Sequence, residues 1–261
     1  MKKAIFQLLI IVAAFLLTWF LFSKINFTGH MDLDGFSTAQ EKKLGELLLE
    51  SLSQSKDEIK HDSINQVVNN ILEKITTANK IEKGAIRLRV FDDQTVNAFA
   101  LPGDQLIIFT GLVDYCKTPE ELAGVMAHEI AHIQKDHVMK KLVKEVGISM
   151  LFVIVAGNGS FEIVSEVLKT ISSRAFDRDQ ESEADIYAVH LLEKAKINPS
   201  GLSDFLFRLS QESDDLSDEL LIISTHPGSA DRSVAILDEI KKNPSKYKEL
   251  HYDFWEHRSE D

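Results

Sequence analysis

The sequence predicts an α+β fold that is mostly helical, with a small three-stranded sheet and one transmembrane helix at the N-terminus. Two patterns predict the α+β part. Runs rich in β-branched and aromatic residues occur between residues 85 and 110, and apolar side chains at helical spacing occupy most of the chain on either side. A third observation, a long uncharged run close to Met1, predicts the transmembrane helix.

The N-terminal segment begins Met1-Lys2-Lys3 and continues with 19 uncharged residues, 4–22. This is about the length that a helix needs to cross a bilayer core of about 30 Å. The run is followed by a poor match to a signal-peptide cleavage site, so we predict an uncleaved signal anchor within residues 1–30. Two lysines precede the run and only Lys24 directly follows it, which predicts a single-pass inner-membrane protein with a cytoplasmic N-terminus and a periplasmic or extracytoplasmic domain.

Residues 31–261 are expected to form one domain after a linker that reaches about residue 35. Amphipathic helices are predicted at residues 37–52 and 63–75. The second helix has one apolar stripe, formed by Val67, Val68, Ile71, Leu72 and Ile75. Strands are predicted at residues 85–91, 96–101 and 105–110, the last two joined by a turn at Pro102-Gly103. Helices at residues 199–210 and 229–241 close the domain.

A helix is also predicted from the segment Thr118, Pro119 and Glu121, which supplies an N-cap, a proline at the first helical position and a capping-box acid. The nearly apolar residues 148–156 are too few to span a membrane, and residues 157–160 then break the pattern. We expect this interval to be buried or to act as a gate.

The predicted helix after Thr118 contains the run His128-Glu129-Ile130-Ala131-His132. Residues four apart lie on the same face of a helix, so both imidazoles can bind one metal ion. Glu129 then lies beside them, where its carboxylate can take a proton from a metal-bound water. This spacing predicts the site of a zinc peptidase with one Zn²⁺ per chain.

A catalytic zinc usually has a third protein ligand. His137 and Cys116 are candidates, but His137 lies about 140° around the helix from His132, and Cys116 is more simply explained as a buried thiol. Glu181 is the better candidate because it lies in an acidic run that opens a second helical pattern. Asp185, one turn later, could accept the free ring N–H of a ligating histidine. A solvated helix N-terminus is the alternative explanation of this run.

Four segments resemble one family of proteins. They are Asn97-Ala98-Phe99 in a predicted strand, the His128–His132 motif, Ser173-Arg174 followed by Glu181-Ser182-Glu183-Ala184-Asp185, and Thr225-His226-Pro227 with Arg232 after it. In this order they resemble the membrane-associated zinc metallopeptidases of the HtpX, BepA and CAAX-prenyl-protease family (gluzincins, peptidase family M48) over about residues 40–242. The resemblance implies a zincin-like metallopeptidase domain in which Glu181 is the third zinc ligand.

The resemblance also implies roles for two further segments. Asn97, Ala98 and Phe99 would form a sheet edge where an extended substrate adds as another strand. Simple packing of a hairpin is the alternative, and both can hold together. His226 would stabilise the oxyanion of the tetrahedral intermediate or occupy the open zinc position in a latent state. The alternative is an ordinary capping or surface histidine.

Charge limits the choice of partners. Residues 1–30 hold three of the 29 basic side chains and no acid, which leaves 26 basic and 41 acidic side chains in residues 31–261. Nucleic acid is therefore an unsuitable partner. We predict a membrane-anchored zinc endopeptidase that cleaves unfolded or misassembled envelope proteins in protein quality control. The alternative is a catalytically silent, zinc-bound chaperone or adaptor that binds unfolded chains at its edge strand.

Overall fold

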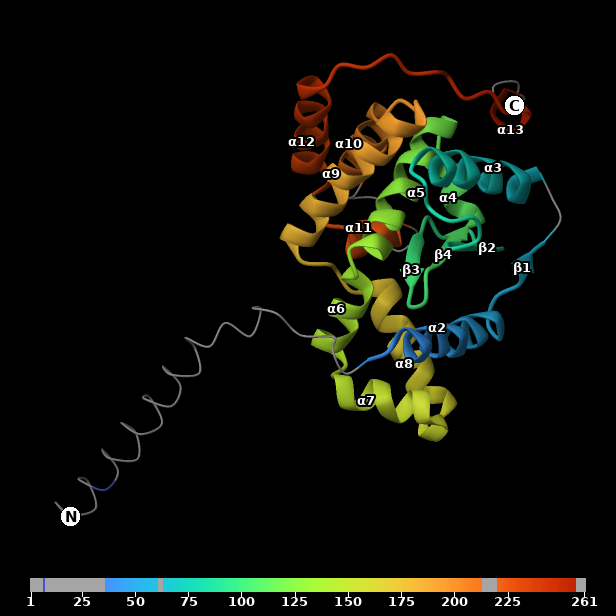
Figure 1. The fold of residues 1–261 in the computed structure, drawn as a ribbon, viewed down its shortest axis with the longest axis vertical. Helices are drawn as coiled ribbons and strands as arrows, with labels where there is room; N and C mark the ends of the chain where they lie inside the picture. Colours follow the sequence, from blue (N-terminus) through green and yellow to red (C-terminus); the bar gives the residue numbers. More distant parts are fainter. Residues whose placement is uncertain (1–6, 8–35, 61–62, 213–219, 257–261) are drawn as a thin grey trace. The chain divides into compact units, whose positions relative to one another are not determined.

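The computed structural model describes residues 36–60, 63–212 and 220–256, together with Gln7 (Figure 1). Its contacts divide the chain into two units, Met1–Gly35 and Phe36–Asp261, and the elements below belong to the second unit. The predicted transmembrane segment and the predicted boundary at residue 30 lie outside the described residues, apart from Gln7. Within the described part, every helix is too short or too polar to cross a bilayer.

The sheet has four strands in the order β1-β2-β4-β3. Strands β2 and β4 are parallel, whereas β1 pairs with β2 and β3 pairs with β4 in antiparallel fashion. The prediction of three strands is therefore wrong by one, because β1 has only two residues and is too short to show a periodic pattern. The bounds are β1 Glu58–Ile59, β2 Arg87–Phe91, β3 Ala98–Leu101 and β4 Gln105–Phe109.

The predicted turn at Pro102-Gly103 joins β3 to β4. Gly103 and Asp104 both have positive φ angles, 71° and 60°, which close the hairpin. A Cβ atom on Gly103 would lie 2.8 Å from the Cα atom of Lys42, so the close approach of helix α2 (Thr38–Ser53) requires glycine there. The Gly103 N–H also donates to Glu41 Oε1 at 3.2 Å. The turn thus fixes the hairpin against α2.

Helices α2 and α3 (Ser63–Ala78) match their predicted positions closely. Ser37 caps α2, where its side chain accepts a hydrogen bond from the Gln40 N–H and Gln40 closes a capping box. All five residues of the predicted apolar stripe on α3 are buried. These helices formed where predicted because their caps and apolar periods agree.

Helix α5 (Pro119–Gln134) lies between the sheet and helices α9 and α10 (Figure 1). Thr118 caps it by accepting a hydrogen bond from the Glu121 N–H at 3.2 Å. The predicted capping box is wrong in its second half, because the Glu121 carboxylate accepts from the Lys117 N–H and from Arg208 instead. Arg208 belongs to α10. The Glu121 carboxylate therefore links α5 to α10 and does not close a capping box at the start of α5.

Helix α10 approaches α5 very closely at Gly124. A Cβ atom added there would lie 2.8 Å from the Cα and Cβ atoms of Leu202. Two helix backbones can approach this closely only where a side chain is missing. Gly124 therefore sets the distance between the two helices.

The apolar interval after α6 (His137–Glu145) forms α7 (Ile148–Val153) and a π-helical turn, η1 (Ile154–Asn158). Leu151, Ile154 and Val155 are buried, as predicted, while Met150 and Val153 are each 40% exposed. The predicted break follows, and helix α8 (Phe161–Ser173) begins after it.

The remaining helices place the second half of the site. Helix α9 begins three residues before Glu181, because Asp177 caps it and forms a capping box with Gln180. The predicted helix at residues 229–241 is α12, and it begins two residues after Pro227. Gly228, with a φ of 83°, is its N-cap. The bounds are α4 Thr110–Tyr115, α9 Arg178–Ala195, α10 Ser200–Glu212, α11 Leu221–Thr225, α12 Ser229–Lys242 and α13 Asp253–Glu256.

Candidate active site

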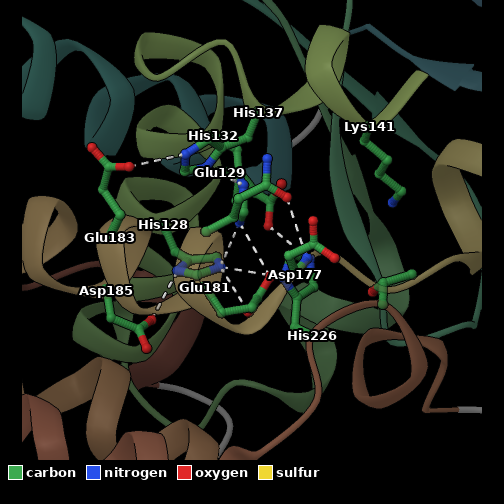
Figure 2. A network of polar contacts seen from close by, with 12 residues as sticks. His128, Glu129, His132, His137, Lys141, Asp177, Glu181, Glu183, Asp185 and His226 are labelled. Carbon is green, nitrogen blue, oxygen red and sulfur yellow. Dashed lines mark hydrogen bonds and ion pairs between the residues drawn. The ribbon is translucent and has the colours of Figure 1, made fainter. Parts of the chain in front are cut away.

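Three elements bring the predicted site residues together. Helix α5 carries His128, Glu129 and His132, α9 carries Glu181, and His226 follows the last residue of α11. Each of these residues is buried, with at most 3% of its surface exposed. Figure 2 shows their polar atoms turned towards one another.

The distances between the three predicted ligands suit a tetrahedral ion. His128 Nε2 lies 3.0 Å from His132 Nε2, and the Glu181 carboxylate oxygens lie 3.6 Å and 3.5 Å from these two nitrogens. Ligand atoms about 2.0–2.1 Å from a tetrahedral zinc ion are separated by about 3.3 Å. Two imidazoles and one carboxylate are also ligands that zinc accepts. The donor set therefore fits a zinc ion.

His226 supplies a fourth nitrogen to the same cluster. Its Nδ1 lies 3.2 Å from His128 Nε2 and 2.9 Å from Glu181 Oε1. The ligand atoms of His128, His132, Glu181 and His226 all lie within 4.8 Å of one another. The imidazole of His226 is thus not a surface group. It is close enough to the other three residues to offer a fourth ligand atom to one ion.

Glu129 lies beside the cluster and is completely buried. Its Oε1 is 3.3 Å from His226 Nε2, and neither carboxylate oxygen has a hydrogen bond from any other described residue. Burial raises the pKa of Glu129, although His226 and His128 oppose the shift. A buried carboxylate with a raised pKa and unused acceptor atoms is suited to take up a proton.

Asp185 lies beside His128, in the place that its predicted role requires. Its Oδ1 lies 2.9 Å from His128 Nδ1, so the Nε2 of His128 remains available to the cluster. Arg232 donates to the same carboxylate from Nε and Nη2, at 2.8 Å and 2.7 Å, and also pairs with Glu181. Burial raises the pKa of Asp185, but the bonds from Arg232 and His128 outweigh it, so the pKa lies below its usual range.

The two predicted histidine ligands differ in their affinity for protons. Burial lowers the pKa of both, but hydrogen bonds to Asp185 and Glu181 raise that of His128 to about 9. For His132, burial dominates and the pKa lies well below its usual value. A metal ion must therefore displace a proton from His128, whereas His132 is already neutral at pH 7.

Sequence reasoning gave no role to Phe176, Lys141 or Arg232. The Phe176 ring stacks on the His132 ring, with 3.9 Å between their centroids. The Lys141 Nζ lies 4.0 Å from the centroid of the same Phe176 ring. Burial lowers the pKa of Lys141 to about 8. Two signals were available: Arg232 follows the Thr225-His226-Pro227 segment, and Phe176 is an apolar residue in the short linker between α8 and α9.

The two alternative third ligands lie outside the four-residue cluster. Cys116 is buried and free of disulfide bonds, as its default explanation predicts. His137 is also buried but contacts His132 through Nδ1, on the side of the ring away from Glu181. Glu181 is therefore the third residue that the structure brings to the two histidines.

The predicted substrate strand lies at the sheet edge, since β3 is the last strand in the order. Asn97, Ala98 and Phe99 are nevertheless buried, with at most 3% exposed. The Asn97 amide donates to the Ser172 carbonyl of α8 at 3.5 Å, and Phe99 packs edge-to-face on Phe109. The packing interpretation is confirmed for Phe99, and substrate binding stays a prediction.

One groove reaches the ligand cluster, and another lies beside the predicted substrate strand. One, of about 470 Å³, runs between α9 and α12 and is lined in part by Glu181, Asp185 and Arg232. The other, of about 370 Å³, lies between α2 and α8 and is lined in part by Asn97 and Phe99. The first groove therefore leads to the ligand cluster and the second to the predicted substrate strand.

The comparison with known proteins agrees with this arrangement. A sequence model described as Peptidase family M48 matches residues 59–240, which is more than half of the chain. The matched range includes all the ligand-cluster residues and Glu129. It ends in α12, two residues before the last residue of that helix.

Three relatives illustrate the similarity. Mitochondrial metalloendopeptidase OMA1 of Schizosaccharomyces pombe is 29% identical over 63% of this chain and 50% of its own length. A putative beta-barrel assembly-enhancing protease of Vibrio cholerae is 24% identical over 82% of this chain and 47% of its own length. Metalloprotease LoiP of Escherichia coli is 27% identical over 64% of this chain and 68% of its own length. The first two relatives are thus matched over about half of their length. The chain belongs to peptidase family M48, a family of metallopeptidases, as the resemblance of its sequence motifs predicts.

Proposed function

We propose that this chain is a zinc-dependent endopeptidase that hydrolyses peptide bonds in unfolded or misassembled envelope proteins. The observation that supports it most is the position of Glu129. Its carboxylate has no hydrogen bond from another described residue, and it lies within the same buried group as His128, His132 and Glu181. A purely structural zinc site has no use for a free carboxylate there.

The protein groups divide the chemistry among them. When bound, zinc would polarise the scissile carbonyl and lower the pKa of an attacking water. Glu129 accepts the proton of that water and returns it to the leaving amine. Asp185 holds Nδ1 of His128, so that Nε2 is the nitrogen that would bind the metal once its proton is displaced, and Arg232 holds Asp185 in place.

His226 gives this chain a resting state and an active state. In the observed arrangement its Nδ1 stands at the fourth position of the cluster, where the attacking water must be. The ring therefore has to move before hydrolysis. His226 follows a helix of only five residues, α11, and precedes Pro227 and Gly228, so its movement need not displace a long helix. Once displaced, the same ring can donate to the oxyanion.

The substrate and the location belong to the same proposal. An unfolded chain can add its backbone to the edge of β3, which would give broad sequence tolerance. The groove between α2 and α8 leads to this strand, and the hydrogen bond from Asn97 to Ser172 of α8 would have to break for a substrate to pair at Asn97. The uncharged residues 4–22 support a membrane anchor, and the charge of the flanking lysines supports a periplasmic domain. One relative is named a beta-barrel assembly-enhancing protease, which supports an envelope role.

The alternative is a silent, zinc-bound chaperone or adaptor that binds unfolded chains. The observation in its favour is His226 at the fourth position, because a site with four protein ligands would have no room for water. The two functions differ in one outcome. Only the peptidase depends on the carboxylate of Glu129.

The test uses the whole 261-residue chain in detergent, loaded with zinc, and a reduced, unfolded casein as substrate. We compare the wild type with Glu129→Gln and with Glu166→Gln, a control at an exposed position on α8. We expect cleavage by the wild type and the control, and a loss of about 10²–10⁴-fold in Glu129→Gln with zinc content unchanged. Casein binding without cleavage by any of the three proteins would support the chaperone instead.

A further inference from the structure

The end of helix α5 turns His137 back towards the ligand cluster. The helix stops at Gln134, and Asp136 adopts left-handed angles, φ 56° and ψ 24°, as the N-cap of α6. On a continuous helix His137 would lie about 140° around the axis from His132. The turn instead brings the two rings together, with 3.0 Å between their Nδ1 atoms.

His137 connects His132 to a carboxylate. Its Nε2 lies 3.4 Å from Glu183 Oε2 (Figure 2). Glu183 in turn pairs with Lys135 at 2.8 Å. His137 is 1% exposed, whereas the Glu183 side chain is 49% exposed. The contacts therefore run from the buried cluster, through one buried ring, to an acid at the surface.

Hydrogen-bond chemistry selects the tautomer of each ring in this series. A carboxylate can only accept, so Nε2 of a neutral His137 carries the proton and its Nδ1 has a free lone pair. His132 must then carry its own proton on Nδ1, because two lone pairs cannot face each other. Its Nε2 consequently has a free lone pair, and this is the atom that lies 3.0 Å from His128 Nε2 in the cluster.

We propose that His137 is a positioning residue for His132, and that with Glu183 it holds His132 in the tautomer that binds a metal through Nε2. This inference rests on the metal site of the proposed function. The two histidines of the motif are then oriented by different means. His128 contacts Asp185 directly at 2.9 Å, whereas His132 reaches Glu183 only through the ring of His137.

The packing around His132 supports this role. Within the part of the chain that the structure describes, His137 is the one residue within hydrogen-bonding distance of His132 Nδ1. Phe176 stacks on the His132 ring and offers it no hydrogen bond. The contact with His137 therefore determines which way the Nδ1 atom of the His132 ring faces.

The experiment compares His137→Phe, His137→Gln and Glu183→Ala in the whole chain. Phenylalanine fills similar space without an acceptor, whereas the glutamine carbonyl can still accept the proton of His132. His190→Gln is the matched control, because His190 is a partly exposed histidine on α9 that pairs with Glu239 away from the cluster. Circular dichroism and thermal melting check that each variant is folded.

The first readout is zinc affinity, measured by competition with a chromophoric chelator. We expect zinc binding to weaken about 10–100-fold in His137→Phe, as outer partners of metal ligands typically do when removed. Glu183→Ala should weaken it less, His137→Gln should keep most of the affinity, and His190→Gln should match the wild type. Wild-type zinc affinity in a folded His137→Phe would overturn the proposal. Wild-type zinc affinity in Glu183→Ala would show that Glu183 does not help to hold His132.

The second readout needs neither zinc nor activity. Ring ¹⁵N spectra of the zinc-free protein report which nitrogen of His132 carries the proton. We expect a protonated Nδ1 in the wild type and a mixture of tautomers in His137→Phe. An unchanged tautomer would contradict the proposal. If the wild type bound no zinc at all, the proposed function would fail while these spectra would still decide the role of His137.

Discussion

Glu129 Oε1 and His226 Nε2 face each other across 3.3 Å, while the other nitrogen of the same imidazole lies 2.9 Å from Glu181. One ring thus stands between Glu129, the proposed proton acceptor, and Glu181, the proposed third metal ligand. Since both sides of the ring are used, movement of His226 changes both contacts at once. Access to the site and the environment of Glu129 are therefore coupled.

Replacement of His226 should open the fourth position. In zinc-loaded His226→Ala we expect a small hydroxamate, which binds metal through two oxygens, to bind about tenfold or more tightly than in the wild type, because no ring competes for the position. Isothermal titration calorimetry measures the affinity. His251→Ala, at an exposed histidine, is the control and should not differ from the wild type. Equal affinities in all three proteins would show that His226 does not occupy the position in solution.

Removal of Glu181 should abolish zinc binding under conditions where the wild type is saturated. Two imidazoles alone make an incomplete site, and Arg232 would lose one of its two acidic partners. Loss of a residue that hydrogen-bonds a metal ligand lowers metal affinity by up to about 100-fold. We expect zinc affinity in Glu181→Ala to fall by more than this, because a ligand itself is removed. Metal analysis after dialysis measures it, with Glu166→Ala as control. Full zinc content in a folded Glu181→Ala would mean that the third ligand is another residue.

The contribution of Asp185 to the stability of the zinc-free protein should be lost in acid. Its pKa is lower in the folded state than in the unfolded chain, so its contribution is complete above the ordinary carboxylate range and is lost as the pH falls through the folded pKa. At pH 7 we expect Asp185→Asn to be less stable by about 3–5 kcal/mol, because Arg232 loses a buried partner. The difference should shrink below about pH 4. Urea unfolding at a series of pH values measures it, and a constant difference would contradict this assignment.

A methyl group at Gly124 should force α5 and α10 apart. The added Cβ would lie 2.8 Å from backbone and side-chain atoms of Leu202, which a rigid helix pair cannot accommodate. We expect Gly124→Ala to lower the free energy of unfolding by about 1–3 kcal/mol. Ser182→Ala, at an exposed position on α9, serves as control. An unchanged melting temperature would show that the two helices separate at little cost.

Much of the fold follows from local pattern. The helix ends at Ser37 and Thr118, the turn at Gly103 and the stripe on α3 were predictable because caps, turns and apolar periods depend on neighbouring residues. The strand β1 was not predictable, since a two-residue strand exists only through its pairing with β2. The same distinction applies to Glu121, whose partner Arg208 is distant in the sequence.

The site divides in a similar way. Helical spacing alone places His128 beside His132, and a family resemblance was needed to choose Glu181. The contact between His137 and His132 escaped sequence reasoning because helical geometry separates them. Only the left-handed Asp136, a non-glycine residue in a conformation that few side chains adopt, brings them together. Tertiary contacts of this kind have no periodic signal.

The order of the ligands along the chain has a consequence during protein synthesis. The ribosome makes His128 and His132 first, Glu181 49 residues after His132, and His226 later still. Until α9 has emerged and docked on α5, the two histidines have no carboxylate to complete a metal site. If the proposed function holds, a nascent chain, or one truncated before Glu181, would lack the third ligand and would neither hold the metal nor cut its neighbours. The sequence distance between the proposed ligands would thus delay proteolytic activity until most of the domain has been made.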